Sequence, residues 1–181
     1  MGGASGVSAN GLTVRPMALG DCDAVAEVRV RGWQFAYAGL LPRAHLDALS
    51  VPDVTAHLRE TFGRRHPDLV AERAGAVVGW ACHGPTRDAD VPPGDGELYA
   101  LYVREEQLST GVGRALMGVC LADSAATGRS VIRLWVLEGN ARARRFYERA
   151  GFVADGARAP YEVAGETVPE IRYVRALAPR P

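Results

Sequence analysis

The stretch Leu134-Trp-Val-Leu-Glu-Gly-Asn-Ala-Arg-Ala-Arg-Arg-Phe-Tyr-Glu-Arg-Ala-Gly-Phe152 passes from an apolar strand pattern into a helical one. Asn140 stands where its side chain can cap the helix, and Gly151 stands where the helix is expected to end. Between them apolar residues recur at i, i+3, i+4 and i+7, which predicts one apolar face with a single hydroxyl. This face consists of Ala143, Phe146, Tyr147 and Ala150. Such a tyrosine can also be an ordinary core aromatic whose hydroxyl bonds the backbone.

A second strand, turn and helix precede this block. The apolar run 97–103 is followed by the turn Leu108-Ser-Thr-Gly-Val-Gly113 and by a helical pattern over about 111–126. Backbone N–H groups at a helix start are unpaired and attract phosphate groups, and glycines let a ligand approach the backbone. The turn alone fits a pyrophosphate site or a mere tight connection. It lacks the third glycine of a dinucleotide-binding turn.

The rest of the chain also mixes strands with helices. Further strands are predicted at 12–17, 69–71, 77–81, 131–137, 152–153 and 171–174. Helices are predicted after Asp21, Pro42 and Pro52, because these residues suit a cap or a first helical position. Prolines and glycines make 84–96 a loop. This order predicts an α/β or α+β fold with a mixed sheet.

The composition indicates an ordinary globular domain. Of 181 residues 48% are apolar, the formal net charge is zero, and the 21 basic residues are all arginine. Neutrality disfavours nucleic-acid and membrane partners, and the lack of lysine excludes a Walker-type loop and a lysine nucleophile. The three cysteines follow no metal-binding pattern, so we expect no metal site. Without a secretion signal they indicate free thiols in the cytoplasm.

Three blocks together resemble the GCN5-related N-acetyltransferase (GNAT) superfamily: Val14-Arg-Pro-Met with the helix after it, the stretch 97–117, and the stretch 134–152. The resemblance implies a mixed, strongly twisted sheet that is flanked by helices and splayed open between its fourth and fifth strands. It also implies acetyl-CoA as the co-substrate in that gap. We expect a single domain over 12–181 after a disordered leader at 1–11.

The resemblance assigns a set of residues to coenzyme A. They are Leu101, Tyr102, Val103, Leu108, Ser109, Thr110, Gly111, Val112, Gly113, Arg114, Asn140 and Tyr147. Within this set Asn140 would contact the pantetheine arm, and a backbone N–H near Leu101 would stabilise the oxyanion. The turn departs from the family pattern, because Leu108, Ser109 and Thr110 replace a Gln or Arg, a Gly, and a Lys or Arg. We therefore expect the backbone amides to bear more of the phosphate binding, with a cofactor affinity that is weaker or altered in its salt dependence.

Amine acetylation needs a base for the amine and an acid for the departing thiolate. Glu97 stands fourteen residues before Gly111, which is the spacing at which family members with a glutamate base carry it. An exposed carboxylate at a strand end would have the same place in the sequence. Glu170, before the last strand, is a less favoured base. Tyr147 matches the family's general acid and is protonated at neutral pH when its pKa is near 10.

The acceptor is the least determined feature of the sequence. Trp33, Tyr37 and Tyr99, with Glu170, are candidates for an aromatic acceptor pocket, or else they pack in the core or at a homodimer interface. A small-molecule amine is favoured, transferred directly in a ternary complex. A protein N-terminus or lysine is one alternative, and a non-catalytic coenzyme-A sensor is another. A solvated helix face is expected for Arg142, Arg144, Arg145 and Arg149, from which one could meet the 3′-phosphate of coenzyme A.

Overall fold

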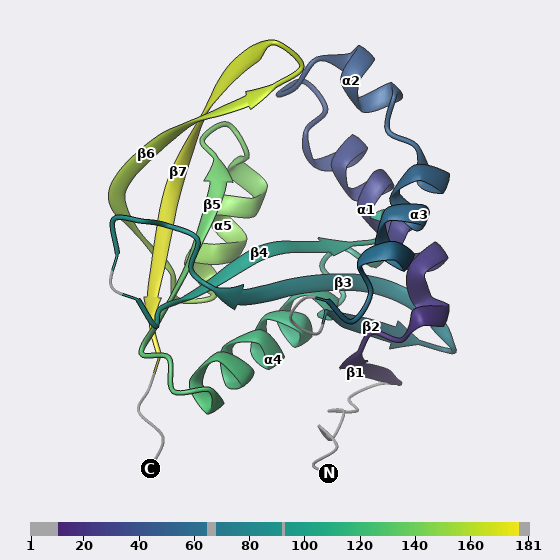
Figure 1. Ribbon diagram of the computed structural model, residues 1–181, viewed down its shortest axis with the longest axis horizontal. Coiled ribbons are helices and arrows are strands. Elements are labelled where there is room, and N and C mark those ends of the chain that lie inside the picture. The colour runs from purple at the N-terminus through teal and green to yellow at the C-terminus, as the bar shows by residue number, and fades with distance from the viewer. Residues whose placement is uncertain (1–10, 65–67, 92, 178–181) are drawn as a thin grey trace.

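Seven strands form one sheet in the computed structural model, which describes residues 11–64, 68–91 and 93–177 (Figure 1). The strands are β1 (Leu12–Pro16), β2 (Leu69–Arg73), β3 (Ala76–Pro85), β4 (Gly96–Val103), β5 (Val131–Leu137), β6 (Val153–Val163) and β7 (Glu166–Ala176). The helices are α1 (Cys22–Ala36), α2 (Arg43–Asp47), α3 (Val51–Thr61), α4 (Val112–Ala126) and α5 (Ala141–Arg149), with short turns η1 (Leu19–Asp21) and η2 (Glu105–Gln107). Across the sheet the order is β1-β2-β3-β4-β5-β7-β6.

The sheet opens between β4 and β5. These two strands run parallel and pair only where Gly96 meets Ile132 and Glu97 meets Arg133, whereas the other neighbouring strands are antiparallel. Beyond Glu97 the two strands diverge, as Figure 1 shows. A register shift in β4 opposite Cys82 and His83 leaves Tyr99 as an extra residue and bends the strand at this point. The predicted mixed sheet, splayed between its fourth and fifth strands, is confirmed.

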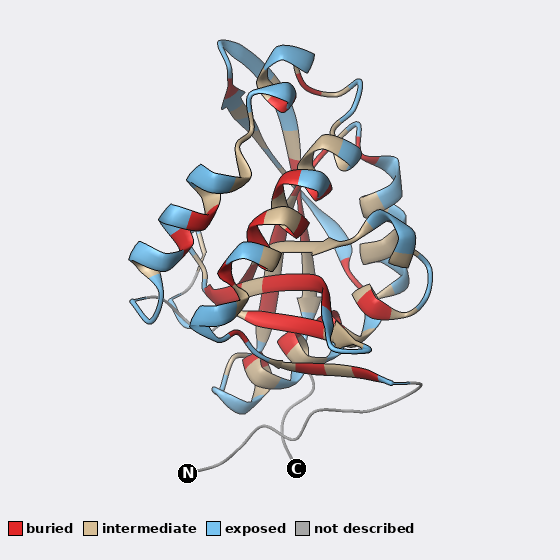
Figure 2. Ribbon diagram, turned by 90° about the vertical axis from the view of Figure 1, so that its right-hand side faces the viewer, coloured by how far each residue is buried: buried red, intermediate tan, exposed pale blue. Residues whose placement is uncertain are grey.

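Helices cover both faces of the sheet. On one face α4 and α5 pack on the larger core cluster, to which Leu116, Cys120 and Phe152 contribute. On the other face α1 and α3 pack on a second cluster around Val25 and Trp80. Figure 2 shows the buried strands between helices whose outer surfaces are exposed. The fold therefore leaves the splay as the place where the central strands are not fully covered by neighbours.

Helix α1 approaches β4 closely at one point. A Cβ on Gly32 would lie 2.8 Å from Cδ1 of Tyr102, a separation that forces something to shift. The absence of a side chain at Gly32 thus sets the position of the Tyr102 ring, which stacks on Trp80 with centroids 6.3 Å apart. Phe35, near the end of the same helix, is 40% exposed.

The last hairpin is much longer than the sequence predicted. Only two and four residues of β6 and β7 were expected, but each strand has 11. Gly156 and Pro160 interrupt the strand pattern of β6, and the pairing accommodates them with a register shift between Ala154 and Arg158. The hairpin closes at Ala164 and Gly165, which both have positive φ. Its far end packs against the segment around α2, where Leu41, Leu46, Tyr161, Val163 and Val168 share a cluster.

The ends of two helices show how far cap residues could be predicted. Asn140 caps α5 as expected, since its Oδ1 accepts from the backbone N–H of Ala143 at 3.1 Å. The prediction that the Asp21 side chain caps α1 was wrong. Its carboxylate accepts instead from the backbone N–H of Ala18 and from Arg15, which ties β1 to η1. Within the described residues, no helix has the length and apolar character needed to cross a membrane, and no group of acidic, histidine and cysteine side chains could hold a metal.

Candidate active site

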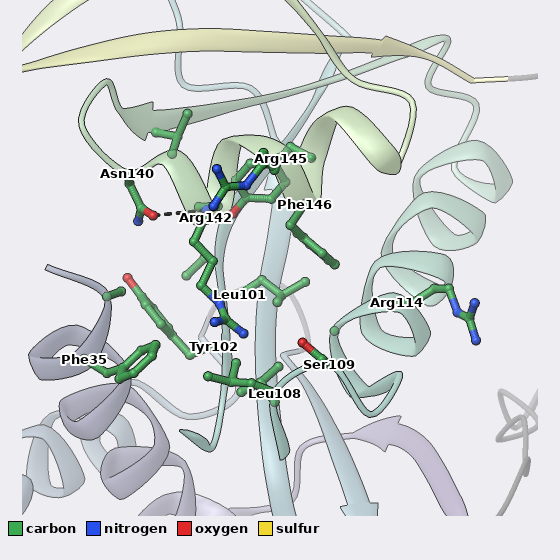
Figure 3. A pocket seen from close by; sticks show the side chains of 18 of the residues that line it. Phe35, Leu101, Tyr102, Leu108, Ser109, Arg114, Asn140, Arg142, Arg145 and Phe146 are labelled. Atoms are coloured by element: carbon green, nitrogen blue, oxygen red, sulfur yellow. Dashed lines mark hydrogen bonds between the residues drawn. The ribbon is translucent and has the colours of Figure 1, made fainter. Parts of the chain in front are cut away.

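A cavity of about 1030 Å³ lies at the splay (Figure 3). Its walls come from the end of α1, the open part of β4, the turn before α4, and α5. Eleven of the twelve residues that the resemblance assigned to coenzyme A line it. The exception is Val112, whose side chain is fully buried in the core beneath the turn. The structure therefore brings the predicted cofactor residues together around one space.

The turn before α4 is held in an unusual backbone conformation. Ser109 has φ +65° and Gly111 has φ +96°, and Gly111 is the N-cap of α4. Backbone that alternates between right-handed and left-handed residues turns successive N–H groups toward one side, which is a common way to bind anions. The nearest atom to a Cβ on Gly111 would be 4.0 Å away. A larger residue there would be disfavoured by its backbone conformation, not by a clash.

An arginine from β2 braces this turn. The Arg73 guanidinium donates to Oε1 of Gln107 at 2.5 Å and to Oγ1 of Thr110 at 3.1 Å. The Thr110 hydroxyl in turn donates to the carbonyl of Gln107 at 2.8 Å. The sequence interpretation gave Thr110 the role of a phosphate donor, whereas the structure uses its hydroxyl within the turn. Neither Arg73 nor Gln107 was foreseen, because only the pairing of β2 in the folded sheet brings Arg73 near the turn.

Helix α5 contributes positive charge to the same cavity. Arg142, Arg145 and Arg149 line it, and none of them forms a hydrogen bond or ion pair with a residue that the structure describes. In Figure 3 the Arg142 side chain extends from α5 into the space beside Phe35, and its guanidinium lies 5.7 Å from that ring. Arg144 differs, because it donates to the Tyr173 hydroxyl and the carbonyl of Glu138. The arginine side chains of α5 thus divide into a structural one and others that face the cavity.

Tyr147 presents its hydroxyl to the cavity from the apolar face of α5. Its ring packs edge-on against Phe146 and Phe152, with centroids 5.4 and 6.1 Å away. Burial raises the pKa of Tyr147 above its ordinary value, so the phenol stays protonated at neutral pH. No hydrogen bond joins the hydroxyl to any described residue. The Tyr147 hydroxyl is therefore a hydrogen-bond donor with no acceptor among the described residues.

The aromatic residues predicted for the acceptor do not all line the same space. Tyr37 lines the first cavity, and its hydroxyl lies 3.3 Å from that of Tyr102. Trp33 packs edge-on against Tyr37 at 4.9 Å but lines a second cavity, of about 840 Å³. Tyr99 lines both, with its hydroxyl donated to the carbonyl of Pro85. The two cavities meet at β4.

The two candidate bases have different surroundings. Glu97 is 2% exposed and accepts three hydrogen bonds from Arg87, one from its backbone N–H at 2.8 Å and two from its guanidinium at 3.1 and 2.5 Å. Glu170 is half-buried and has no hydrogen-bond donor among the described residues. Burial raises the pKa of Glu170, with opposing influences from Arg87 and Glu97. Burial is the main cause that raises the pKa of Tyr37 and of Tyr161, and the charge of Glu170 adds to it, so the Glu170 carboxylate lies near both phenols.

These features define a class of enzyme, the acyltransferases whose acyl donor carries phosphate groups. Such a donor needs a phosphate-binding helix start at one end of its cavity and a proton donor for the leaving group at the other. The cavity at the splay is lined both by the turn at the start of α4 and by Tyr147, to which the resemblance gives these two roles. The chain belongs to the acetyltransferase (GNAT) family, whose profile matches residues 35–152. The family's co-substrate is acetyl-CoA, and the predicted family and enzyme class are confirmed.

Known proteins similar to this chain carry the same assignment. YuaI of Bacillus subtilis (strain 168), described as an uncharacterized N-acetyltransferase, is 31% identical over 134 residues, which are 71% of this chain and 73% of that protein. Mycothiol acetyltransferase of Thermobispora bispora is 42% identical over 87 residues, 46% of this chain and 29% of that protein. The structure of yncA, a putative acetyltransferase from Salmonella typhimurium with its cofactor acetyl-CoA, has a TM-score of 0.67 at 23% identity and covers 93% of this chain and 95% of that one.

Proposed function

We propose that this protein transfers the acetyl group of acetyl-CoA to the primary amine of a small molecule, directly and within a ternary complex, from a single domain over residues 12–181. The observation that carries the proposal is the cavity at the splay, which joins the turn before α4 to the unpaired hydroxyl of Tyr147. Two free cysteine thiols, Cys22 and Cys120, are fully buried. They fit the reducing environment of the cytoplasm.

The residues of the cavity fit coenzyme A at both of its ends. The turn at Ser109 and Gly111 offers backbone N–H groups to a pyrophosphate. The side chains of Arg142, Arg145 and Arg149 form no hydrogen bond or ion pair with a described residue. They offer the positive charge that the turn itself lacks. At the other end the open part of β4 offers unpaired backbone N–H groups to the thioester carbonyl, as the resemblance implies for Leu101.

The chemical step makes a C–N bond and breaks a C–S bond. The amine attacks the thioester carbonyl and loses a proton to a base, and the departing thiolate takes a proton from Tyr147. Tyr147 recovers its proton from solvent, and the base releases its own to solvent, so the step balances. Burial keeps Tyr147 in the protonated form that this role requires.

We assign the base role to Glu170 in place of Glu97. Three donors from Arg87 occupy the Glu97 carboxylate, so accepting a proton there would break an ion pair at a buried position. The Glu170 carboxylate is half-buried and unpaired, and its raised pKa brings it closer to that of a useful base. Glu97 then acts as the anchor of Arg87.

A small-molecule acceptor is supported by an apolar cluster that packs against Trp33 and Tyr37, two residues that line the cavities. The hairpin of β6 and β7 packs onto the segment around α2 through Leu41, Leu46, Tyr161, Val163 and Val168. An extended peptide would have to displace these apolar contacts to pass through. The similar mycothiol acetyltransferase, which matches under half of this chain, is named for a small molecule. The alternative functions are acetylation of a protein N-terminus or lysine and a non-catalytic coenzyme-A sensor. A homodimer is compatible with each of these functions.

The test combines binding with turnover. Acetyl-CoA should raise the melting temperature by linkage. Coenzyme A thiol should then be released with at least one amine of a panel that spans amino acids, aminosugars, polyamines and peptides. Stabilisation without thiol release from any amine would favour the sensor. No stabilisation at saturating acetyl-CoA would contradict the proposed function, and release with peptides alone would favour a protein substrate.

A further inference from the structure

The second cavity lies beside the first on the side of β4 that faces α1 and α3. Its volume is about 840 Å³, and Tyr99, Ala100 and Tyr102 line both cavities. A molecule in the second cavity would therefore reach the same stretch of β4 as the thioester would from the first. On the proposed function, this makes the second cavity the place from which an acceptor amine approaches.

The walls of the second cavity combine aromatic rings with guanidinium groups. The aromatic residues are Trp33, Phe62, Trp80, Tyr99 and Tyr102. The Arg29 guanidinium lies 4.9 Å from the ring centroid of Trp80, and the Arg87 guanidinium lies 4.4 Å from that of Tyr99. Stacking on a ring leaves the edge of a guanidinium directed sideways, where its N–H groups can meet a planar anion.

Positive charge dominates the described residues that line this cavity. Arg29, Arg64 and Arg87 stand against the single carboxylate of Asp68, whose Oδ2 already accepts from the Trp80 indole at 2.9 Å. The pair of Arg87 with Glu97 uses Nε and one terminal nitrogen of the guanidinium. Arg64 is exposed, and its side chain forms no hydrogen bond or ion pair with a described residue. A polycationic acceptor would be repelled from such a cavity.

We propose that the second cavity binds the acceptor, and that this acceptor is an amine with a carboxylate on an aromatic or apolar body, as in an apolar amino acid. The carboxylate would meet the guanidinium groups of Arg29 and Arg64, and the apolar body would lie among the rings. The positive surroundings also favour the unprotonated amine, which is the nucleophile. The proposal rests on the proposed function for the acetyl transfer itself, and on the second cavity for the class of ligand.

Matched pairs of amines test this directly. Phenylalanine and 2-phenylethylamine differ by one carboxylate, and so do tryptophan and tryptamine. Turnover should be compared at equal concentrations of free amine. We expect kcat/KM to be at least about tenfold higher for the amino acid of each pair, since ionic hydrogen bonds are worth that much or more. Preference for the decarboxylated amines would overturn the proposal.

Variants connect the preference to the cavity. Arg29→Gln and Arg64→Gln should each raise the KM for phenylalanine several-fold, and change the KM for 2-phenylethylamine much less. Arg31→Gln removes the same charge from an exposed position of α1 that lines neither cavity, and should change neither substrate. Equal effects on both amines, or an equal effect of Arg31→Gln, would contradict the assignment. If Arg29→Gln also lowers the melting temperature, Arg64→Gln alone tests the preference, because Arg64 is exposed.

A binding measurement separates this proposal from the proposed function. Trp33 and Trp80 line the cavity, so phenylalanine should change tryptophan fluorescence at lower concentrations than 2-phenylethylamine does, with no turnover needed. Binding of phenylalanine without acetylation of any amine would sink the enzyme proposal and leave the ligand class standing. Acetylation of other amines without phenylalanine binding would overturn the ligand class and leave the enzyme proposal standing.

Discussion

Replacing Tyr147 by phenylalanine removes a hydroxyl that makes no hydrogen bond to the described protein. The ring contacts with Phe146 and Phe152, at 5.4 and 6.1 Å, do not depend on that hydroxyl. Since no buried bond is lost and ring volume is nearly conserved, we expect the free energy of unfolding to change by no more than about 0.5 kcal/mol. Affinity for acetyl-CoA should also change little.

Turnover should fall by about 10²-fold. Loss of a general acid typically costs 10²–10⁴-fold, and a thiolate with a pKa near 8.5 leaves fairly well without help, so the lower end applies. A hundredfold loss corresponds to about 2.7 kcal/mol of transition-state stabilisation. Burial raises the pKa of Tyr147 above 10, so the wild-type protein should keep its proton donor throughout the neutral and mildly alkaline range. The loss should therefore be the same from pH 6 to pH 9.

The assay is release of coenzyme A thiol, measured together with the melting temperature on one preparation of each protein. Tyr37→Phe is the matched control, because it removes a hydroxyl from the same cavity that is already paired with Tyr102 at 3.3 Å. Full activity of the Tyr147 variant would refute the reasoning and leave Tyr147 as a packing residue. Lower stability with unchanged turnover per folded molecule would do the same. An equal loss in Tyr37→Phe would show that the cavity, and not one proton donor, is responsible.

Four further variants address the base, the phosphates and the turn. Glu170→Gln should lower turnover at neutral pH and less at high pH, where more amine is unprotonated. Burial raises the folded pKa of Glu170, so above that pKa the charged form costs stability. The melting temperature of the variant at pH 7 should therefore be equal or higher, whereas Glu97→Gln should lower it by releasing Arg87; the opposite pattern would restore Glu97 as the base. Arg142→Gln with Arg145→Gln should weaken acetyl-CoA binding about tenfold or more at low salt and less at high salt, by titration calorimetry; an effect independent of salt would argue against phosphate contacts. Gly111→Val should cost about 1–3 kcal/mol through its φ of +96° and weaken acetyl-CoA binding; unchanged affinity in a folded variant would exclude the turn from the site.

The parts of the site that are local in sequence could be predicted from it. The cap at Asn140, the apolar face with Tyr147 and the helix start at Gly111 each lie within one element and its flanking turn. Periodicity and the conformational freedom of glycine decide such features over a few residues. The family resemblance then added what no local pattern contains, the splay between β4 and β5.

The parts that depend on distant residues could not be predicted. Arg73 reaches Thr110 only because β2 lies beside β3 in the folded sheet. The role of Glu97 depends on Arg87, which a loop of irregular backbone carries to it. Likewise, Trp33 and Tyr37 lie one turn apart at the end of α1, yet they line different cavities. These two cavities meet at β4, which belongs to a distant part of the sequence. Spacing along a helix predicts which residues are neighbours, but it does not predict which cavity each of them lines.

In a chain whose basic residues are all arginine, residue type alone does not indicate which of them bind a ligand, but their partners do. Arg172, with 8% of its side chain exposed, binds Asp88, Asp90 and Asp155 and so fastens the loop before β4 to β7. An arginine saturated by carboxylates in this way has no capacity for a further anion. Arg142 lines a cavity without a carboxylate partner among the described residues, and a guanidinium in that position keeps its full attraction for phosphate. We therefore propose that Arg142, on the opposite wall, supplies the positive charge that the turn before α4 lacks, and we expect the departure of this turn from the family pattern to leave the affinity for the co-substrate intact.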